Sequence, residues 1–205
     1  MLTLLMPSPG ETFIFEPGAQ ASSESFFEQA CELYPSYRIE QDSEGSVLVM
    51  SPTGGNSSFR NNAILSQLTR WASENGKGSV FESKALFVLP DGSKRGPDAA
   101  WVSNEKLRQV PPEKKDDFLP LVPEFIIELR SKSERLPRLQ SKMQDWICNG
   151  VQLAWLIDAD QKKIWIYRQD SAEPDILDGP AAVRGAGPVL GFQLEMETIW
   201  QGLHG

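Results

Sequence analysis

The spacing of apolar residues predicts two long helices separated by a series of strands. Apolar positions recur at helical intervals over residues 56–75, and Gly76 ends this pattern. A second apolar stripe follows Pro137, a residue favoured in the first turn of a helix, and stops at residues 149–150. Strand-like runs lie before, between and after these helices. This order indicates an α/β protein.

The remaining apolar runs are short and bounded by turn residues, as is typical of strands. Residues 38–50 predict a hairpin with its turn at residues 42–45. The other predicted strands are two within residues 79–89, then 98–102, 125–128, 153–157 and 163–167. Residues 7–21 are rich in Pro and Gly and predict an irregular arm, which a short helix follows over residues 25–33. We expect the apolar C-terminal tail to lie over the core.

Length and composition are those of a globular protein. With 205 residues, of which 40% are hydrophobic, we expect one domain at residues 1–205. Within it, residues 1–37 form an arm and a short helix, and residues 38–205 form the core. No apolar run approaches the ~18 residues that span a bilayer, and the start lacks the features of a signal peptide. Cys31 and Cys148 predict two buried, reduced thiols in a cytoplasmic protein without membrane contact.

Histidine and charge content restrict the possible chemistry. The only histidine is His204, so Ser-His-Asp catalysis and a His-based zinc site are improbable. The net charge of −8 opposes broad non-specific binding of nucleic acid. Residues 130–142 nevertheless contain five basic side chains and a single acid, Glu134. A local basic surface is therefore compatible with the acidic total, although a solvated charge run would have the same composition.

Two acids stand inside strand-like runs. Asp98 opens one run and Glu128 ends another. A carboxylate within a hydrophobic sheet costs free energy unless a cation binds it, and paired carboxylates suit a hard cation. Without histidine ligands, this points to Mg²⁺ or Mn²⁺. Because strand side chains alternate, Arg130 is expected on the same face as Glu128, which is the layout of a phosphodiester-cleaving centre.

Several ordered motifs resemble the Uma2 family of restriction endonuclease-like proteins, within the PD-(D/E)xK nuclease superfamily. The likeness extends from about residue 38 to residue 200. Its motifs are residues 50–55, 95–103, 125–131, 139–144 and 149–158. The resemblance implies a restriction-endonuclease-like core with a mixed central β-sheet flanked by helices. It also implies a metal-dependent endonuclease that cleaves DNA.

The resemblance assigns roles to particular residues. Asp98, Glu128 and the backbone carbonyl of Leu129 correspond to the metal ligands. The superfamily pattern has lysine two residues after the second acid, where this chain has Arg130. Arginine stays protonated and acts only as a charge and hydrogen-bond donor, so Arg130 is a candidate catalytic residue that could stabilise charge developing on the phosphate. Lys142, at the edge of the next helix's apolar stripe, is the candidate replacement.

Other interpretations stay open at this stage. Arg130 could form a structural salt bridge with Glu128 or Asp98. The chain could be a non-catalytic nuclease-fold module that binds DNA or a protein. A carboxylate-pair sugar hydrolase fits the acids but leaves the basic cluster unexplained. A further acid could come from Glu40, Glu44 or Glu82. We also expect a homodimer, because nucleases that cut both strands commonly act in pairs.

Overall fold

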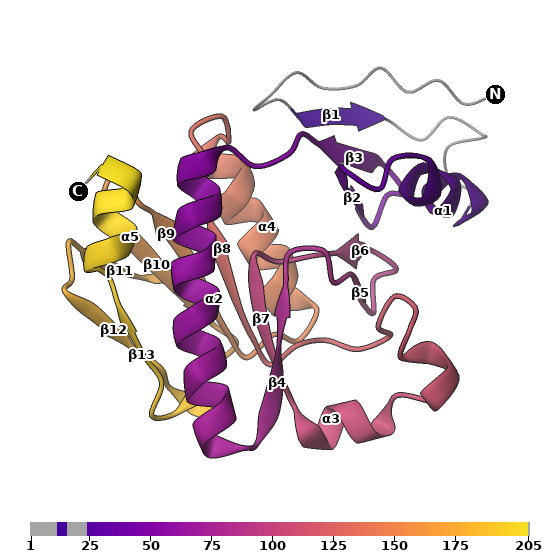
Figure 1. The fold of residues 1–205 in the computed structure, drawn as a ribbon. Coiled ribbons are helices and arrows are strands. Elements are labelled where there is room, and N and C mark those ends of the chain that lie inside the picture. The colour runs from indigo at the N-terminus through magenta and orange to yellow at the C-terminus, as the bar shows by residue number, and fades with distance from the viewer. Residues whose placement is uncertain (1–11, 16–23, 205) are drawn as a thin grey trace.

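A mixed six-stranded sheet forms the centre of the protein. The computed structural model describes residues 12–15 and 24–204 (Figure 1). The strand order is β11-β10-β9-β8-β7-β4; β8 and β9 run parallel, and every other neighbouring pair is antiparallel. The strands are β4 (Gly78–Glu82), β7 (Ala99–Ser103), β8 (Phe125–Leu129), β9 (Leu153–Asp158), β10 (Lys163–Arg168) and β11 (Asp175–Asp178).

One long helix covers each face of this sheet, so the molecule has an α/β/α layering (Figure 1). On one face, α2 (Gly55–Asn75) buries Ile64 and Leu68 in a cluster with Ile127. On the other face, α4 (Leu136–Cys148) buries Met143 in a cluster with Ile126. Because β8 exposes alternate side chains to the two faces, it contributes to both cores. The α4 helix also makes the crossover between the parallel strands β8 and β9.

A smaller sheet lies beside the main sheet, at the end where strand β7 begins (Figure 1). Its strand order is β1-β3-β2-β6-β5, and α1 (Glu24–Leu33) packs on it. The strands are β1 (Thr12–Phe15), β2 (Arg38–Gln41), β3 (Val47–Met50), β5 (Phe87–Val88) and β6 (Lys94–Arg95). Three residues separate β6 from β7, so the chain passes directly from the small sheet into the main one. Asp98 lies at this junction.

Short elements complete the structure. Helix α3 (Asn104–Gln109) follows β7, and α5 (Glu197–Gln201) lies near the C-terminus. The hairpin of β12 (Ala182–Arg184) and β13 (Gln193–Glu195) packs beside α2. Three 3₁₀ helices are Pro112–Lys114, Gly187–Val189 and Gly202–His204. Phe192 and Ile199 are buried in the α2-side core, so the prediction that the tail covers the core is confirmed.

The structure confirms the restriction-endonuclease-like α/β fold class and corrects details. Helix α2 coincides with the predicted helix, and Gly76 ends it in the left-handed conformation at φ 63°. The two strands predicted within residues 79–89 belong to different sheets. Most of the predicted arm at residues 7–21 is outside the described residues, but residues 12–15 form strand β1 where irregular structure was predicted. None of the described helices is long and apolar enough to cross a bilayer.

Candidate active site

The two acids predicted from the sequence lie opposite each other at one end of the main sheet. The β7–β8 register pairs Ala99 with Ile127, and one further step places Asp98 opposite Glu128. Alternation places both on the α4 face, with Ala100 and Ile126. The backbone N–H of Leu129 donates to Asp98 Oδ2 at 2.8 Å.

A half-buried arginine bridges these two acids. Arg38, from β2 of the small sheet, has one guanidinium nitrogen 2.8 Å from Asp98 Oδ1. Its other terminal nitrogen lies 3.6 Å from Glu128 Oε2 and 2.8 Å from Glu40 Oε1. Burial opposes the charge on Arg38, but the surrounding carboxylates outweigh it and raise the pKa of the guanidinium well above its ordinary value. Sequence reasoning did not identify Arg38 as a site residue.

Lys142 enters the same cluster from α4. Its ammonium nitrogen lies 2.8 Å from Glu128 Oε1 and 2.9 Å from Glu40 Oε1. The buried residues Leu139 and Met143 fix the orientation of the helix, and the stem of Lys142 passes beside them toward the sheet. The prediction that Lys142 points toward the two acids is therefore confirmed in its geometry.

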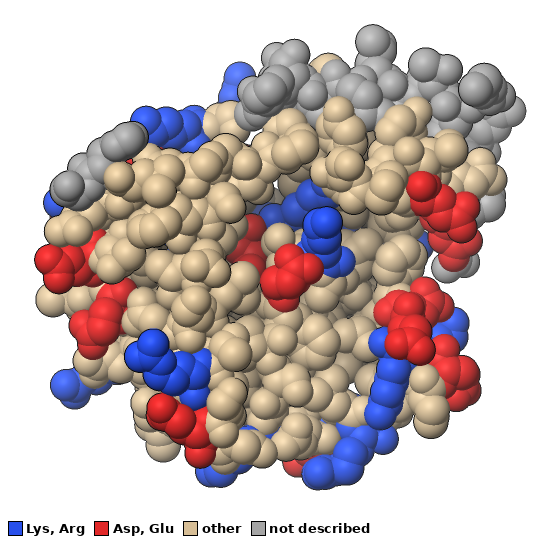
Figure 2. Space-filling view, viewed as in Figure 1, with Lys and Arg blue, Asp and Glu red and all other residues tan. Residues whose placement is uncertain are grey.

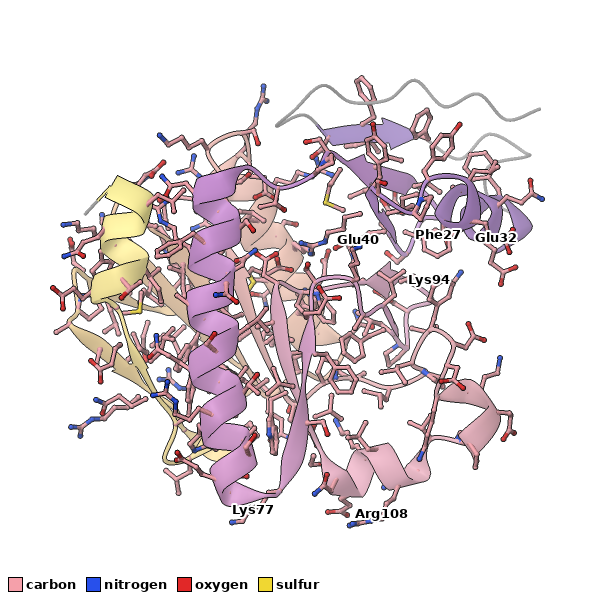
Figure 3. All side chains as sticks on the ribbon, viewed as in Figure 1. Phe27, Glu32, Glu40, Lys77, Lys94 and Arg108 are labelled. Atoms are coloured by element: carbon pink, nitrogen blue, oxygen red, sulfur yellow. The ribbon has the colours of Figure 1, made fainter. Side chains whose placement is uncertain are left out.

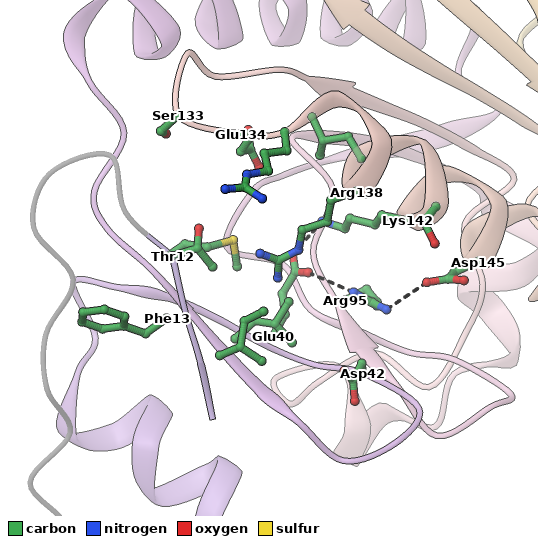
Figure 4. Close-up of a pocket in the computed structure, with 16 residues that line it drawn as sticks. Thr12, Phe13, Glu40, Asp42, Arg95, Ser133, Glu134, Arg138, Lys142 and Asp145 are labelled. Carbon is green, nitrogen blue, oxygen red and sulfur yellow. Dashed lines mark hydrogen bonds and ion pairs between the residues drawn. The ribbon is translucent and has the colours of Figure 1, made fainter. Parts of the chain in front are cut away.

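Glu40 is the acid around which most cations gather. Its side chain is 1% exposed and accepts hydrogen bonds from Arg38, from Lys142 and from the N–H of Gly96. Arg95 lies 3.8 Å from its other oxygen and also pairs with Asp145 at 3.1 Å (Figure 4). Burial opposes ionisation, but the three cations outweigh it and lower the pKa of Glu40 to about 2.

The pKa of Glu128 is shifted in the opposite direction, although Glu128 shares two neighbouring cations with Glu40. Burial raises the pKa of Glu128 above its ordinary value; Lys142 and Arg38 oppose the rise, and the neighbouring charges of Asp98 and Glu40 add to it. Oε1 of Glu128 lies within ion-pair distance of the Lys142 ammonium, but none of the described residues donates a hydrogen bond to this oxygen. Its negative charge is thus the least satisfied in the cluster.

Other predicted residues lie outside the cluster. Arg130 follows the end of β8, and its guanidinium pairs with Asp158 at 2.6 Å instead of with Glu128 or Asp98. It also donates to the carbonyl of Glu134. Glu82 is exposed and accepts a hydrogen bond from Ser83. Of the three further acids considered, only Glu40 therefore reaches the cluster, because β2 carries it there together with Arg38.

Glu40 and Lys142 of this cluster line a cleft of about 640 Å³, whereas Asp98 and Glu128 are not among the residues that line it. Strands β1 and β3 line one side, and the first two turns of α4 with the loop before it line the other (Figure 4). Figure 3 shows Glu40 where the small sheet meets the main sheet. The face drawn in Figure 2 has Lys and Arg side chains scattered among Asp and Glu, with no broad basic surface. Any anionic ligand would therefore be held locally.

The donor chemistry fits a hard divalent cation in part. Asp98 and Glu128 offer carboxylate oxygens, and Oε1 of Glu128 is buried without a hydrogen-bond donor. Within residues 12–15 and 24–204, however, no group of three or more Asp, Glu, His or Cys side chains is arranged to hold a metal ion. Arg38 already pairs with both acids. The protein thus provides oxygen ligands for a cation, but its own basic side chains already balance part of the negative charge of these ligands.

The order of the strands and the flanking helices define a restriction-endonuclease-like α/β fold. A crystal structure with a similar fold is that of a putative nuclease belonging to DUF820 from Anabaena variabilis ATCC 29413, which matches with a TM-score of 0.67. The two sequences are 17% identical over 80% of this chain and 89% of that one. No curated protein matches the chain. The chain belongs to the Uma2 family, described as putative restriction endonuclease, which it matches over residues 24–197.

Proposed function

We propose that the protein is a metal-dependent endonuclease that hydrolyses phosphodiester bonds in DNA, with Mg²⁺ or Mn²⁺ as its cofactor. One observation carries the proposal. The Lys142 ammonium contacts Glu128 and Glu40 beside Asp98, at the floor of a cleft. Two carboxylates with a nearby lysine are the elements that metal-assisted phosphodiester hydrolysis needs. The family match and the fold support the same reaction class.

Each side chain has a role in this proposal. Asp98, Glu128 and the carbonyl of Leu129 would hold the cation, which supplies charge that polarises the phosphate and acidifies a water. Lys142 orients the attacking water and stabilises negative charge on the phosphate oxygens. Glu40 positions Lys142 through their 2.9 Å contact. Arg38 pairs with both acids and balances part of their negative charge.

Cleavage assays with purified protein test this function. We expect nicking or cutting of DNA with Mg²⁺ or Mn²⁺ and none with EDTA. Asp98→Asn and Glu128→Gln should each abolish cleavage, because each removes a charge that the cation needs. Asp178→Asn is the matched control, since Asp178 is an exposed acid on β11. Activity that survives Asp98→Asn would place the chemistry elsewhere.

One observation favours a second candidate function. Arg38 and Lys142 already pair with the acids of the cluster, so it is electrostatically compensated without a metal. A non-catalytic nuclease-fold module that binds DNA or a protein would have such a site. Calorimetry separates the candidates, because an endonuclease should bind Mn²⁺ and the non-catalytic module should not. Glu128→Gln should remove that binding.

We further propose that the protein is a homodimer in the cytoplasm. Symmetric dimers are the commonest oligomers of soluble proteins. Cys31 and Cys148 are free thiols, as is usual in a reducing compartment. Light scattering that gives a monomer mass over a wide concentration range would contradict the dimer.

A further inference from the structure

The two long walls of the cleft differ in chemistry. On the small-sheet side, Ile14 of β1 pairs with Leu48 of β3, and Thr12 pairs with Met50. Alternation directs these residues to the cleft, while Val47 and the other alternate positions of β3 face the core beneath α1. Ile14 is 48% exposed. This wall therefore presents apolar surface to the cleft.

The α4 wall carries the basic side chains of Arg135, Arg138 and Lys142 beside the acids Glu134 and Asp145. Arg135 precedes α4 and Arg138 lies in its first turn, and both line the cleft with exposed side chains. Arg138 points into the cleft toward Glu40 (Figure 4). Within the part of the chain that the structure describes, neither arginine has an ion-pair partner, whereas Arg95 and Lys142 are paired with acids. Two guanidinium groups thus remain available for phosphate.

The depth of the cluster limits what can reach it. The side chains of Glu40, Glu128 and Asp98 are 1%, 4% and 11% exposed. The cleft that Glu40 and Lys142 line, about 640 Å³, has the volume of a pocket for a nucleotide-sized ligand. A continuous duplex is much wider and keeps its bases stacked inside. Enzymes whose target atoms cannot be reached in a stacked duplex act on single strands or on nucleotides extruded from the duplex.

From these three observations we infer that the site takes single-stranded DNA, such as a frayed end, a flap or a gap, and not continuous duplex. The apolar wall at Ile14 receives the face of an unstacked base, and Arg135 and Arg138 receive the flanking phosphates. The scissile phosphate then lies toward Lys142 at the floor. This inference rests on the proposed nuclease function and specifies its substrate. The small footprint agrees with the net charge of −8.

Fluorescence anisotropy without divalent metal tests the substrate class, because binding is then read without cleavage. The probe is a labelled oligothymidylate of about 12 nucleotides, a length typical of single-strand grooves. A blunt duplex of equal length is the comparison. We expect the single strand to bind at least about tenfold more tightly than the duplex. The contact of one base with a side chain typically strengthens binding by a factor of about ten or more. Equal or tighter binding of the duplex would overturn the inference.

Variants of the two walls test the binding mode. Ile14→Glu and Arg138→Gln should each weaken oligothymidylate binding about tenfold or more. Arg138→Gln should also lower the steepness of the log–log salt dependence by about 0.7, the value for one phosphate on a single strand. The matched controls are Ile176→Glu, at an exposed position on β11, and Arg108→Gln, at an exposed position on α3 well away from Glu40 (Figure 3). Unchanged binding in both wall variants would overturn the inference.

The failure of this inference can be told apart from that of the nuclease function. Metal-dependent cutting of duplex that Glu128→Gln abolishes, together with no preference for the single strand, overturns the substrate class and leaves the nuclease. If the protein neither binds nor cuts DNA of any form, both proposals are overturned.

Discussion

The Lys142 ammonium lies 2.8 Å from Glu128 Oε1, so a helix residue supplies the positive charge beside an acid on the central strand β8. The residue two positions after Glu128, Arg130, instead pairs with Asp158. The chain thus separates two tasks. Lys142 supplies charge to the acid cluster, and Arg130 holds the end of β8 against the end of β9.

Loss of the Lys142 charge should stop the reaction. We expect Lys142→Met to lower the single-turnover cleavage rate with Mn²⁺ by about 10²–10³, the typical effect of removing one preorganised donor. Lys142→Arg keeps the charge and should lose less. Lys132→Met is the matched control, because Lys132 is an exposed lysine just before α4. Circular dichroism should verify that each variant is folded, and a Lys142→Met rate equal to that of the control would remove Lys142 from the mechanism.

The two neighbouring acids should affect stability in opposite ways. The pKa of Glu40 is lowered to about 2, so its stabilising contribution is present above pH 4.5 and is lost as the pH falls toward 2. Glu40→Gln should therefore reduce the free energy of unfolding more at pH 7 than at pH 3. The pKa of Glu128 is raised, so its ionisation opposes folding at neutral pH. Urea titrations should show that Glu128→Gln is less destabilising than Glu40→Gln at pH 7.

The Arg130–Asp158 pair should matter for stability. Asp158 is 1% exposed, and removing the partner of a buried charge typically costs about 3–5 kcal/mol. We expect Arg130→Ala to lower the free energy of unfolding in urea by about this amount. Arg168→Ala removes a cation from an exposed pair with Asp175 and should cost at most about 1 kcal/mol. Equal costs for the two variants would show that the Arg130 pair is solvated.

Gly78 allows strand β4 to approach β7 closely. A Cβ there would lie 2.4 Å from the carbonyl oxygen of Val102 and 2.5 Å from the ring of Trp101. We expect Gly78→Ala to destabilise the protein by about 1–3 kcal/mol, as overpacking typically does. Gly54→Ala is the control, because its Cβ would meet no atom within 4 Å. A thermal melt of Gly78→Ala that matches the control would contradict this close packing.

The two thiols should differ in reactivity. The sequence predicts that both are buried, but Cys148 is exposed at the end of α4. Burial raises the pKa of Cys31 to about 11, and the thiolate is the reactive form. A disulfide reagent at pH 8 should therefore modify one thiol quickly, and Cys148→Ser should abolish that fast phase. Fast modification that persists in Cys148→Ser would mean that Cys31 is accessible and ionised.

Local patterns were sufficient for much of the fold and for three residues of the cluster. Asp98 and Glu128 were recognisable because acids are unusual within apolar strand runs. Lys142 followed from helical phase. The role of Arg38 was hidden, because β2 meets the main sheet only through tertiary packing, and its contact with Asp98 spans 60 residues of sequence. Strand β1 was not predicted because the surrounding proline and glycine residues favour irregular structure. The role of Asp158 was not predicted because an acid beside a turn is common.

The cluster also joins the two sheets. Arg38 and Glu40 belong to the small sheet, whereas Asp98 directly precedes β7 and Glu128 lies on β8, two neighbouring inner strands of the main sheet. Detachment of the small sheet would remove Arg38 from Asp98 and Glu128 and leave Lys142 with one acid fewer. Such a partly unfolded state would contain uncompensated charge in a hydrophobic surrounding, which is costly. The same contacts that assemble the site therefore make unfolding of the two sheets cooperative, so that intermediates with an incomplete site are sparsely populated.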